Sequence, residues 1–321
     1  MAQGASMHIP SHLMSDRMLI ASSLDARGYD TRVLRRAATA GSLTRLARGI
    51  YVDAAVWQSA SSREQHVLRC RALAARLGSE VVLAGASAAA VLGLTYLGQW
   101  PSRACALNSV ADGTRVRGGV SWWGHDDRST GVADLGWVRA TDAYRTAVEL
   151  CARESYLAGL VTADSALRAA GHRGAGDGAR ELLTMAEALR LRRGARRVER
   201  VATFANGHSE SAGESWTRVV LADLGVEHPE LQVDITDDGL WLARVDFCWP
   251  GRRIVLEFDG EKKYRAPMRG PSRSAEDVVI DEKRREDRLR AAGWTVLRIV
   301  WDDLREPERL RRMLRQHGLL R

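Results

Sequence analysis

Three carboxylates lie within two otherwise apolar segments of the C-terminal third of the chain. Asp246 is part of "ARVDFCWP", and Glu257 and Asp259 are part of "RIVLEFD"; the other residues of both segments are typical of buried strands. An unpaired carboxylate in an apolar sheet is costly. Either the second segment is an edge strand with one wet face, or a positive charge lies against these oxygens.

The spacing of the two segments brings these acids together. Side chains alternate between the two faces of a strand. If residues 250–253 form a four-residue turn, Trp249 pairs with Ile254, and in the same register Asp246 stands directly across from Glu257. The third acid lies two residues farther along the same face. The apolar residues predicted for the opposite face are Val245, Phe247, Trp249, Ile254, Leu256 and Phe258.

Carboxylates that face each other across a sheet repel and destabilise it. A divalent cation between them removes that conflict. Mg²⁺ prefers oxygen ligands and keeps coordination positions for water and phosphate, so it suits this set of acids. The residues therefore predict a magnesium site formed by Asp246, Glu257 and Asp259.

The order of motifs around this hairpin resembles the core of the PD-(D/E)XK nuclease superfamily. The segment "DEKRREDRLRAAGWTVLRIVWDDL" is similar to the helix and strand that follow the hairpin in very-short-patch-repair-like endonucleases. The resemblance implies that Asp246 and Glu257 bind Mg²⁺, that Glu214 completes or orients the metal shell, and that Arg285 steadies a phosphate. The matching features are Glu214 on the leading helix, "VDF", "EFDG", Arg285, Leu289, "GW" and "LRI".

One position departs from the superfamily pattern. The usual motif ends in lysine, and Asp259 stands there in this chain. A cation is still needed near the attacking water or the transition-state phosphate, so Lys263 is the expected replacement, with Lys262 as its less favoured neighbour. Asp259 would then be either an additional metal ligand or a sign of reduced activity.

The N-terminal segment has the layout of a winged helix-turn-helix. Residues 15–28 predict a helix capped by Ser15, and residues 29–41 predict a second helix capped by Asp30. Residues 42–52 alternate around a glycine turn, as a short β-wing would. This layout is similar to the N-terminal domain of AbiEi-type antitoxins, which are autorepressors of toxin–antitoxin systems. The similarity implies DNA as a partner and a toxin protein as a second candidate partner.

Four arginines are the candidate DNA contacts of this segment. Arg32, Arg35 and Arg36 lie on the outer side of the second predicted helix, and Arg48 lies in the turn of the wing. A helix in the major groove needs such donors for phosphates and base edges. The alternative is a packing module whose arginines are simply solvated.

The basic charge of the chain is concentrated in its N-terminal part. The chain has 321 residues, a formal net charge of +8 and a pI near 9.8. Residues 207–321 hold 21 basic and 22 acidic groups, whereas the first 206 residues hold 27 basic and 18 acidic groups. Electrostatic binding of a polyanion is therefore expected in the first part. The alternative for the total charge is compositional, since arginine-rich chains often come from GC-rich genomes.

Residues 62 to about 200 predict mainly helices with a β interlude. The segment Val81–Ser102 lacks charges, but its glycines and proline favour a small-residue helix followed by a loop over a membrane span. The cysteines show neither paired spacing nor a Cys/His cluster, which argues against a zinc site or a disulfide framework and suits a reducing compartment. They are Cys70, Cys105, Cys151 and Cys248.

Together these observations predict a cytoplasmic, multidomain α/β protein that does not cross a membrane. A winged helix-turn-helix (1–55) precedes a mainly helical, AbiEi-like domain (62–205) and a PD-(D/E)XK-like α/β domain with a mixed sheet (209–321). The predicted function is Mg²⁺-dependent hydrolysis of phosphodiester bonds in DNA. The alternative is an antitoxin-like, DNA-binding transcriptional repressor whose nuclease-like domain does not cut.

Overall fold

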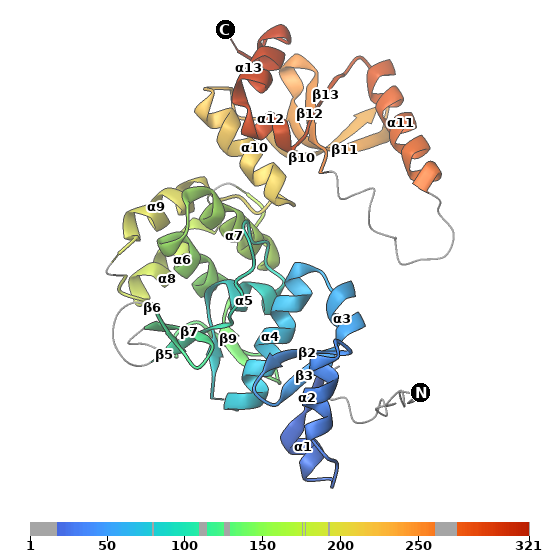
Figure 1. Cartoon of the computed structure of the whole chain (residues 1–321). Helices are drawn as coiled ribbons and strands as arrows, with labels where there is room; N and C mark the ends of the chain where they lie inside the picture. Colours follow the sequence, from blue (N-terminus) through green and yellow to red (C-terminus); the bar gives the residue numbers. More distant parts are fainter. Residues whose placement is uncertain are drawn as a thin grey trace. The chain divides into compact units, whose positions relative to one another are not determined.

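The protein is a mixed α/β chain with three β-sheets and many helices, as its computed structural model shows (Figure 1). It forms two compact units, each described by itself below. The first comprises the described residues of Met1–Leu94, Gly98–Leu150 and Glu187–Arg190, and the second those of Thr95–Leu97, Cys151–Ala186 and Leu191–Arg321. The structure describes residues 18–78, 80–108, 114–124, 129–174, 176, 178–191, 193–260 and 275–320.

The N-terminal part contains a three-stranded sheet with two short helices. Strand order is β1-β3-β2, and β3 pairs antiparallel with both neighbours. The β2–β3 hairpin turns at Arg48 and Gly49, as the wing pattern predicts. The elements are β1 (Met18–Ile20), α1 (Ala21–Asp25), α2 (Arg32–Thr39), β2 (Leu43–Ala47) and β3 (Ile50–Asp53).

The helix predicted over residues 15–28 is wrong at its start. Met18 and Leu19 form strand β1 and pair with Val52 and Tyr51 of β3, so the helix begins only at Ala21. Pairing buries both apolar side chains, with 4% and 1% exposure. Ser15, the predicted cap, lies outside the described residues. The partner strand β3 lies about thirty residues farther along the chain. A helical pattern in the local sequence gives no information about pairing with so distant a segment.

The second predicted helix is confirmed as α2 with a shifted start. Asp30 accepts a hydrogen bond from Arg32 N at 2.9 Å, but the residue at the cap position is Thr31. Leu34 is the buried residue of α2, and it packs in a core with Leu19 and Tyr51.

The remainder of the first unit is built around a six-stranded mixed sheet with the order β6-β7-β5-β4-β9-β8. The middle region therefore has more strand than a mainly helical domain with a β interlude suggests, because three short strands join the predicted ones through nonlocal pairing. The strands are β4 (Val82–Leu83), β5 (Cys105–Asn108), β6 (Thr114–Arg117), β7 (Val120–Gly124), β8 (Val132–Asp134) and β9 (Arg139–Thr141).

The helices of this unit include α3 (Ala54–Ser59) and α4 (Ser62–Leu77), and the latter starts at a capping box formed by Ser61 and Glu64. The uncharged segment 81–102 forms strand β4, helix α5 (Gly85–Leu92) and a loop. Within the described part of the chain, no helix has the length and apolar character to cross a bilayer.

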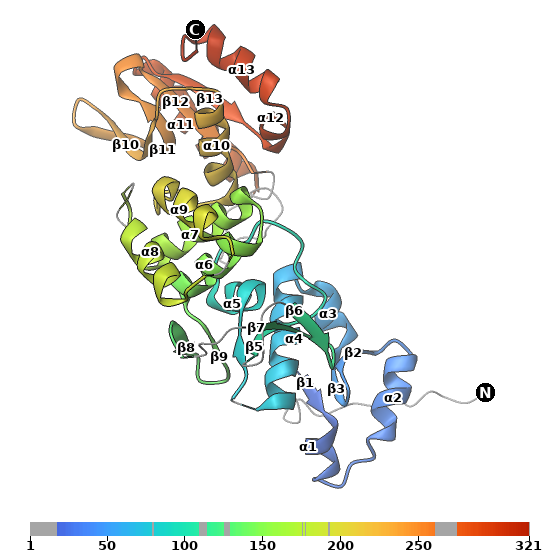
Figure 2. The same cartoon turned by 90° about the vertical axis from the view of Figure 1, so that its left-hand side faces the viewer.

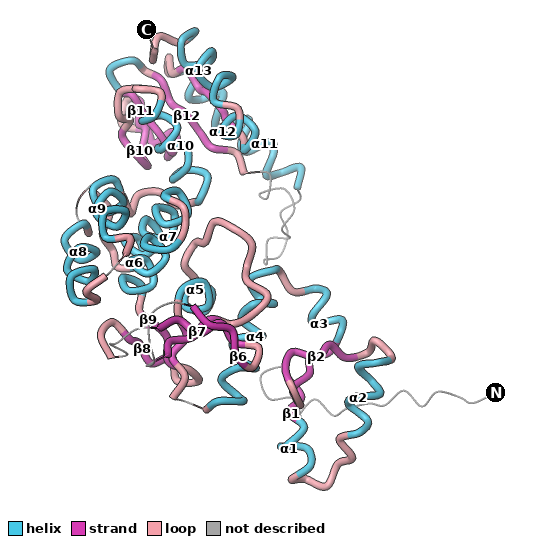
Figure 3. Tube along the Cα trace, turned by 60° about the vertical axis from the view of Figure 1, so that its left-hand side comes forward, coloured by secondary structure: helices cyan, strands magenta, loops and turns pink. Residues whose placement is uncertain are grey.

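Four helices follow between residues 143 and 204, and no strand interrupts them in the described residues (Figure 3). Helix α6 (Ala143–Arg153) crosses from the first unit to the second. It is followed by α7 (Tyr156–Ala169), α8 (Ala179–Ala188) and α9 (Ala195–Phe204). Glycines permit close approaches here, since a Cβ on Gly159 would lie 2.8 Å from the Cα of Cys151.

The C-terminal part is a four-stranded mixed sheet between two layers of helices. Strand order is β10-β11-β12-β13; β10, β11 and β12 are antiparallel neighbours, and β13 runs parallel to β12. Figure 1 shows α11 on one side of the sheet and α10, α12 and α13 on the other. The strands are β10 (Glu230–Asp237), β11 (Leu240–Trp249), β12 (Ile254–Phe258) and β13 (Thr295–Ile299).

The helices of this part each have an apolar side against the sheet. Leu221 of α10, Leu304 of α12 and Leu310 of α13 share one core, and Leu289 of α11 belongs to the other. The hairpin of β10 and β11 extends beyond the other strands (Figure 2) and exposes Trp241 near its tip. The helices are α10 (Ala212–Asp223), α11 (Ala275–Ala291), α12 (Trp301–Arg305) and α13 (Pro307–Gln316).

Candidate active site

The predicted hairpin between the acidic strands is confirmed. Residues Pro250–Arg252 form a 3₁₀ turn, Arg253 has a left-handed φ of 52°, and Trp249 is the Cα partner of Ile254. The paired segment ends at Phe247 and Leu256, and beyond it Oδ2 of Asp246 accepts a hydrogen bond from Phe258 N, the residue after Glu257, at 3.0 Å. The turn therefore brings Asp246 near the end of β12 that carries Glu257, and the direct pairing of the two acids stays a prediction.

Strand β12 is not an edge strand, because it lies between β11 and β13. All five of its residues are buried, including Glu257 at 7% exposure. An exposed face therefore does not account for the acid. Of the two explanations that the sequence leaves open, positive charge beside the carboxylate is the one that the structure supports.

The predicted faces of the hairpin are correct with one exception. Phe247 and Trp249 pack with Ile254, Leu256 and Phe258 in the core of α10, α12 and α13. Val245, which the alternation assigns to this face, packs instead in the core of α11. The exception lies beside Gln232 of the neighbouring strand, whose φ of 52° marks a local distortion of regular β geometry.

Glu257 has an arginine neighbour on helix α11 and another on strand β13. Its Oε2 accepts a hydrogen bond from Arg285 Nη2 of α11 at 2.5 Å and lies 3.7 Å from Arg298 Nη2 of β13. Its Oε1 is buried and has no hydrogen-bond partner among the described residues. Burial raises the pKa of Glu257, and the bond from Arg285 opposes that rise. One oxygen of this carboxylate is thus compensated by arginine, whereas the other receives no hydrogen bond from any residue that the structure describes.

Glu214 lies in the first turn of α10 and is 8% exposed. Its backbone N–H donates to Ser211 Oγ at 3.1 Å, and its Oε2 accepts from Glu210 N at 2.8 Å. Burial, and next the charge of Asp246, raise the pKa of Glu214 to about 7. A carboxyl group with this pKa can take up or release a proton near neutral pH.

Gln232 of β10 connects Glu214 to Asp246. Its Nε2 lies 3.0 Å from Oε2 of Glu214 and 3.2 Å from Oδ1 of Asp246. The helix-borne acid and the strand-borne acid therefore share a donor. Glu214, Asp246 and Glu257, which the family resemblance groups together, lie in one region of the structure.

Arg285 and Arg298 belong to an ion-pair network along one side of this region. Both guanidinium groups contact Oε1 of Glu282, at 2.6 and 2.5 Å, and Arg298 Nε also donates to Glu286 Oε2 at 3.0 Å. Burial would raise the pKa of Glu282, but the hydrogen bonds from the two arginines hold it at about 2. Arg285 thus reaches an acid of the site, whereas the resemblance implies a phosphate as its partner.

Asp259 lies just after β12, and its Oδ2 is 3.8 Å from Arg298 Nη1. The structure thus places it next to a cation at the end of the strand. Lys263 and Lys262, the expected replacements for the motif lysine, lie outside the described residues.

Sequence reasoning missed Gln232, Arg298, Glu282 and Glu286. Arg298 is the Cα partner of Glu257 in the parallel pairing of β12 and β13. Arg298 is the middle residue of the "LRI" motif that carries the family resemblance, so this motif could have indicated Arg298 as a site residue. Glu282 and Glu286 lie three residues before and one after Arg285 on a charged helix. Gln232 had no sequence signal, because only the pairing of β10 with β11 brings it to the acids.

The residues present fit a hard divalent cation at Asp246 and Glu257. Their ligand atoms are carboxylate oxygens, which Mg²⁺ prefers, and Oε1 of Glu257 is a buried acceptor to which no described residue donates. Among the described residues, no group of three or more His, Cys, Asp or Glu side chains is arranged to hold a metal ion. A bound ion would thus rely on these two acids, with Glu214 adjacent and water completing its shell.

A buried ion pair fixes the helix that carries Glu214. Asp164 of α7 accepts hydrogen bonds from Ser215 Oγ at 2.7 Å and from Arg218 Nη1 at 2.8 Å, both on α10. It also accepts one from Asn206 N at 2.7 Å. The side chains of Arg218 and Asp164 are only 9% and 1% exposed. The position of Glu214 is therefore tied to α7 through the next residue in the chain.

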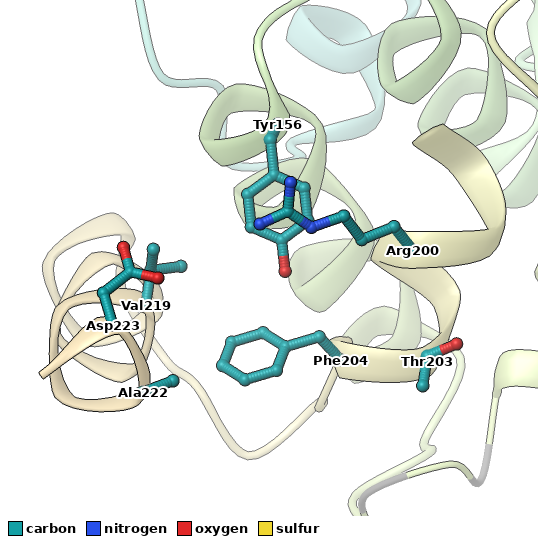
Figure 4. Close-up of a pocket in the computed structure, with 7 residues that line it drawn as sticks. All are labelled: Tyr156, Arg200, Thr203, Phe204, Val219, Ala222 and Asp223. Carbon is teal, nitrogen blue, oxygen red and sulfur yellow. The ribbon is translucent and has the colours of Figure 1, made fainter. Parts of the chain in front are cut away.

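A pocket of about 360 Å³ lies on the other side of α10 (Figure 4). Phe204 of α9 and Tyr156 of α7 face α10 across it, and the guanidinium carbon of Arg200 lies 4.2 Å from the Tyr156 ring centroid. None of the acids described above lines this pocket, so it is separate from the candidate active site. Its remaining lining residues are Thr203, Val219, Ala222 and Asp223.

The four arginines predicted to contact DNA are all exposed. Arg32, Arg35 and Arg36 lie on α2, and Arg48 lies in the β2–β3 turn. In the described part of the chain none of the four forms a salt bridge. Their charges are therefore available to an anionic partner.

Two proteins of Mycobacterium tuberculosis are similar to this chain. They are uncharacterized protein Rv2248 of strain H37Rv and uncharacterized protein MT2308 of strain CDC 1551. Each is 30% identical over 280 residues, which cover 86% of this chain and 93% of the relative. The chain belongs to their family.

The match reaches into each of the three predicted domains, because the unmatched part of the chain is smaller than any one of them. No model of a known protein family matches the chain.

Proposed function

We propose that this protein is a Mg²⁺-dependent DNA endonuclease with a PD-(D/E)XK-like C-terminal domain. The observation that carries the proposal is the approach of Asp246 to the end of β12, where its Oδ2 accepts from Phe258 N beside Glu257 and Oε1 of Glu257 is buried with no donor among the described residues. An unpaired buried carboxylate oxygen is costly in a purely structural role, and it is a ready ligand for a cation.

In this proposal Asp246 and Glu257 would hold Mg²⁺, and Glu214 would complete or orient its shell. When bound, Mg²⁺ would polarise the scissile phosphate and lower the pKa of a bound water. Glu214 lies beside Asp246 and shares the Nε2 donor of Gln232 with it, so it is placed to orient that shell.

Arg285 and Arg298 would supply positive charge for the phosphate. Burial would lower the pKa of Arg285, but hydrogen bonds with Glu282 and Glu257 raise it instead, so the group stays charged. A fixed guanidinium stabilises developing negative charge without having to reorganise. These cations compensate for the aspartate at position 259, where the usual motif has lysine.

DNA would be held mainly by the N-terminal part of the chain. Arg32, Arg35, Arg36 and Arg48 are exposed there, and the first 206 residues carry the excess of basic groups. We propose that α2 and the β2–β3 hairpin act as the recognition helix and wing of a winged helix-turn-helix.

Incubation of the full-length protein with supercoiled plasmid DNA tests the enzymatic proposal. Nicked or linear product should form with Mg²⁺, and none should form with EDTA or with Asp246→Asn. The matched control is Asp302→Asn, because Asp302 is a 71% exposed acid of the same domain that lies on α12. Equal cleavage by the two variants would contradict the proposed role of Asp246.

One observation favours a second function. Arg285 and Arg298 already lie against Glu257, so the acid is partly compensated in the absence of a metal. A DNA-binding repressor with a non-cutting domain, working beside a toxin protein, would need only the N-terminal arginines. Intact DNA after incubation with the wild-type protein and Mg²⁺, combined with binding that depends on α2, would favour this function.

A further inference from the structure

The amide of Gln232 is held in one orientation by its contacts. Arg244 Nε donates a hydrogen bond to Oε1 of Gln232 at 3.0 Å. A guanidinium group can only donate, so it fixes the carbonyl end of the amide toward Arg244. The two N–H groups of Nε2 are then left for the oxygens of Glu214 and Asp246.

The backbone of Gln232 is also unusual. Its φ is 52°, in the left-handed region that residues with a Cβ rarely adopt, and it lies inside a β-strand. The flanking pairs Leu231–Phe247 and Val233–Val245 place it opposite Asp246 in the register. Strained backbone of this kind persists where the surroundings over-determine it, and it gathers at functional sites.

The position of this amide between two acids has a chemical consequence. Glu214 and Asp246 accept from the same Nε2 group, so their carboxylates lie close together and repel when both are ionised. A neutral donor shared between them holds the oxygens at a fixed separation without contributing a charge of its own. Without it, the first turn of α10 would bring Glu214 to Asp246 with no attractive contact between the two side chains.

We infer that Gln232 is a positioning residue of this site, which holds Glu214 beside Asp246 through hydrogen bonds to both carboxylates. Arg244 acts through Gln232 by fixing the orientation of its amide. This inference rests on the proposed function, because it concerns the same acids.

The test compares Gln232→Met and Arg244→Met with the wild-type protein. Methionine keeps the length of glutamine but has no donor, so Gln232→Met should weaken Mg²⁺ binding at least tenfold in a calorimetric titration. It should also lower kcat for plasmid cleavage at least tenfold and leave KM for DNA within about twofold. If Gln232 only stabilised the fold, Gln232→Met would instead lower the unfolding temperature of the metal-free protein, and kcat would not fall while KM stayed unchanged.

Arg244→Met should have a smaller effect in the same direction, because the amide can then turn its oxygen toward the acids. The double variant should be no worse than Gln232→Met, since both changes act through the same amide. Arg252→Met is a matched control. The two arginines are alike in exposure and in their ion pairs. Arg244 is 47% exposed and lies 3.5 Å from Glu210, and Arg252 is 48% exposed and lies 3.4 Å from Glu227.

Two results would overturn the inference, and they differ from each other. Wild-type Mg²⁺ affinity and kcat in Gln232→Met, with loss of both in Asp246→Asn, would remove Gln232 and leave the proposed function standing. A wild-type protein that neither binds Mg²⁺ in the titration nor cuts DNA would overturn the proposed function, and this inference with it. Additive losses in the double variant would separate Arg244 from Gln232 and contradict its role.

Discussion

Glu257 of β12 and Arg298 of β13 are register partners on parallel strands, and Nη2 of Arg298 lies 3.7 Å from Oε2 of Glu257. A second guanidinium, from Arg285 of α11, reaches the same oxygen at 2.5 Å. A buried acid on a central strand is therefore compensated from a neighbouring strand and from a covering helix. The other oxygen of Glu257 is buried and has no hydrogen-bond partner in the part of the chain that the structure describes.

Arg285→Met should destabilise the metal-free protein by about 3 kcal/mol, because removal of one partner leaves a buried carboxylate poorly compensated. Mg²⁺ should restore part of this loss and should raise the unfolding temperature of the variant more than that of the wild type. Urea titrations with Mg²⁺ and with EDTA measure both effects. Arg290→Met, which removes a 58% exposed partner of Glu286, should cost less than about 1 kcal/mol. Equal losses in the two variants would contradict the account.

Gly213→Ala should disrupt the site through packing alone. A Cβ at Gly213 would lie 1.9 Å from Cε1 of Phe258, so the first turn of α10 would have to move away from β12. Overpacking of this kind costs about 1–3 kcal/mol, and the shift would carry Glu214 away from Asp246. Thermal unfolding and Mg²⁺ titration measure the two effects.

Gly251→Ala is the control for this substitution, because nothing lies within 4 Å of the added Cβ and the backbone is not left-handed there. It should unfold and bind Mg²⁺ like the wild type. A Gly213→Ala variant that also behaves like the wild type would show that α10 does not depend on this close approach.

The hairpin could be predicted from the sequence because its determinants are local. A four-residue turn fixes Trp249 opposite Ile254, and Asp246 then lies near the end of β12 that carries Glu257. Gln232 and Arg298 could not be placed in this way, because β10 and β13 reach the site only through strand pairing. Strand β1 was missed for the same reason. Its three residues fit a helical pattern locally, but pairing with the distant strand β3 determines their structure.

The stability of the first unit should fall in acid because of His66. This side chain is fully buried, and its Nδ1 donates to Pro101 O at 2.8 Å, so its Nε2 accepts from Ser87 Oγ at 2.8 Å. Burial lowers the pKa of His66 from 6.5 to about 4. The unfolded chain therefore binds a proton that the folded chain does not, and stability is lost as the pH falls from about 6.5 to 4.

The shift corresponds to about 3 kcal/mol across that window, at 1.36 kcal/mol for each pKa unit. Urea unfolding at a series of pH values measures it in the wild type and in His66→Gln. The variant keeps a polar side chain but has no imidazole to protonate, so its stability should vary less between pH 6.5 and 4. Identical pH dependence in the two proteins would rule out His66 as the cause.

The arginines of α2 should carry DNA affinity independently of cleavage. Replacement of Arg32, Arg35 and Arg36 by Ala should weaken binding of the full-length protein to duplex DNA in EDTA. Each lost phosphate contact should reduce the slope of log affinity against log salt by about 0.9. Fluorescence anisotropy at several salt concentrations measures this slope.

The control for this triple variant replaces three arginines of α13, Arg311, Arg312 and Arg315, which lie in the near-neutral part of the chain. This control should bind DNA with nearly the wild-type slope. If the α2 variant kept the wild-type affinity and slope, the winged-helix proposal would be wrong.

The most direct test of the central claim is the unfolding temperature of the full-length protein as a function of Mg²⁺ concentration. If Asp246 and Glu257 hold the ion, the wild type should gain stability as RT ln(1 + [L]/Kd), or about 2.7 kcal/mol at a hundredfold excess over Kd. Asp246→Asn should be at least as stable as the wild type in EDTA, because it relieves repulsion between the acids, and it should gain nothing from Mg²⁺. A wild-type protein whose unfolding temperature ignores Mg²⁺ at every concentration would contradict the claim.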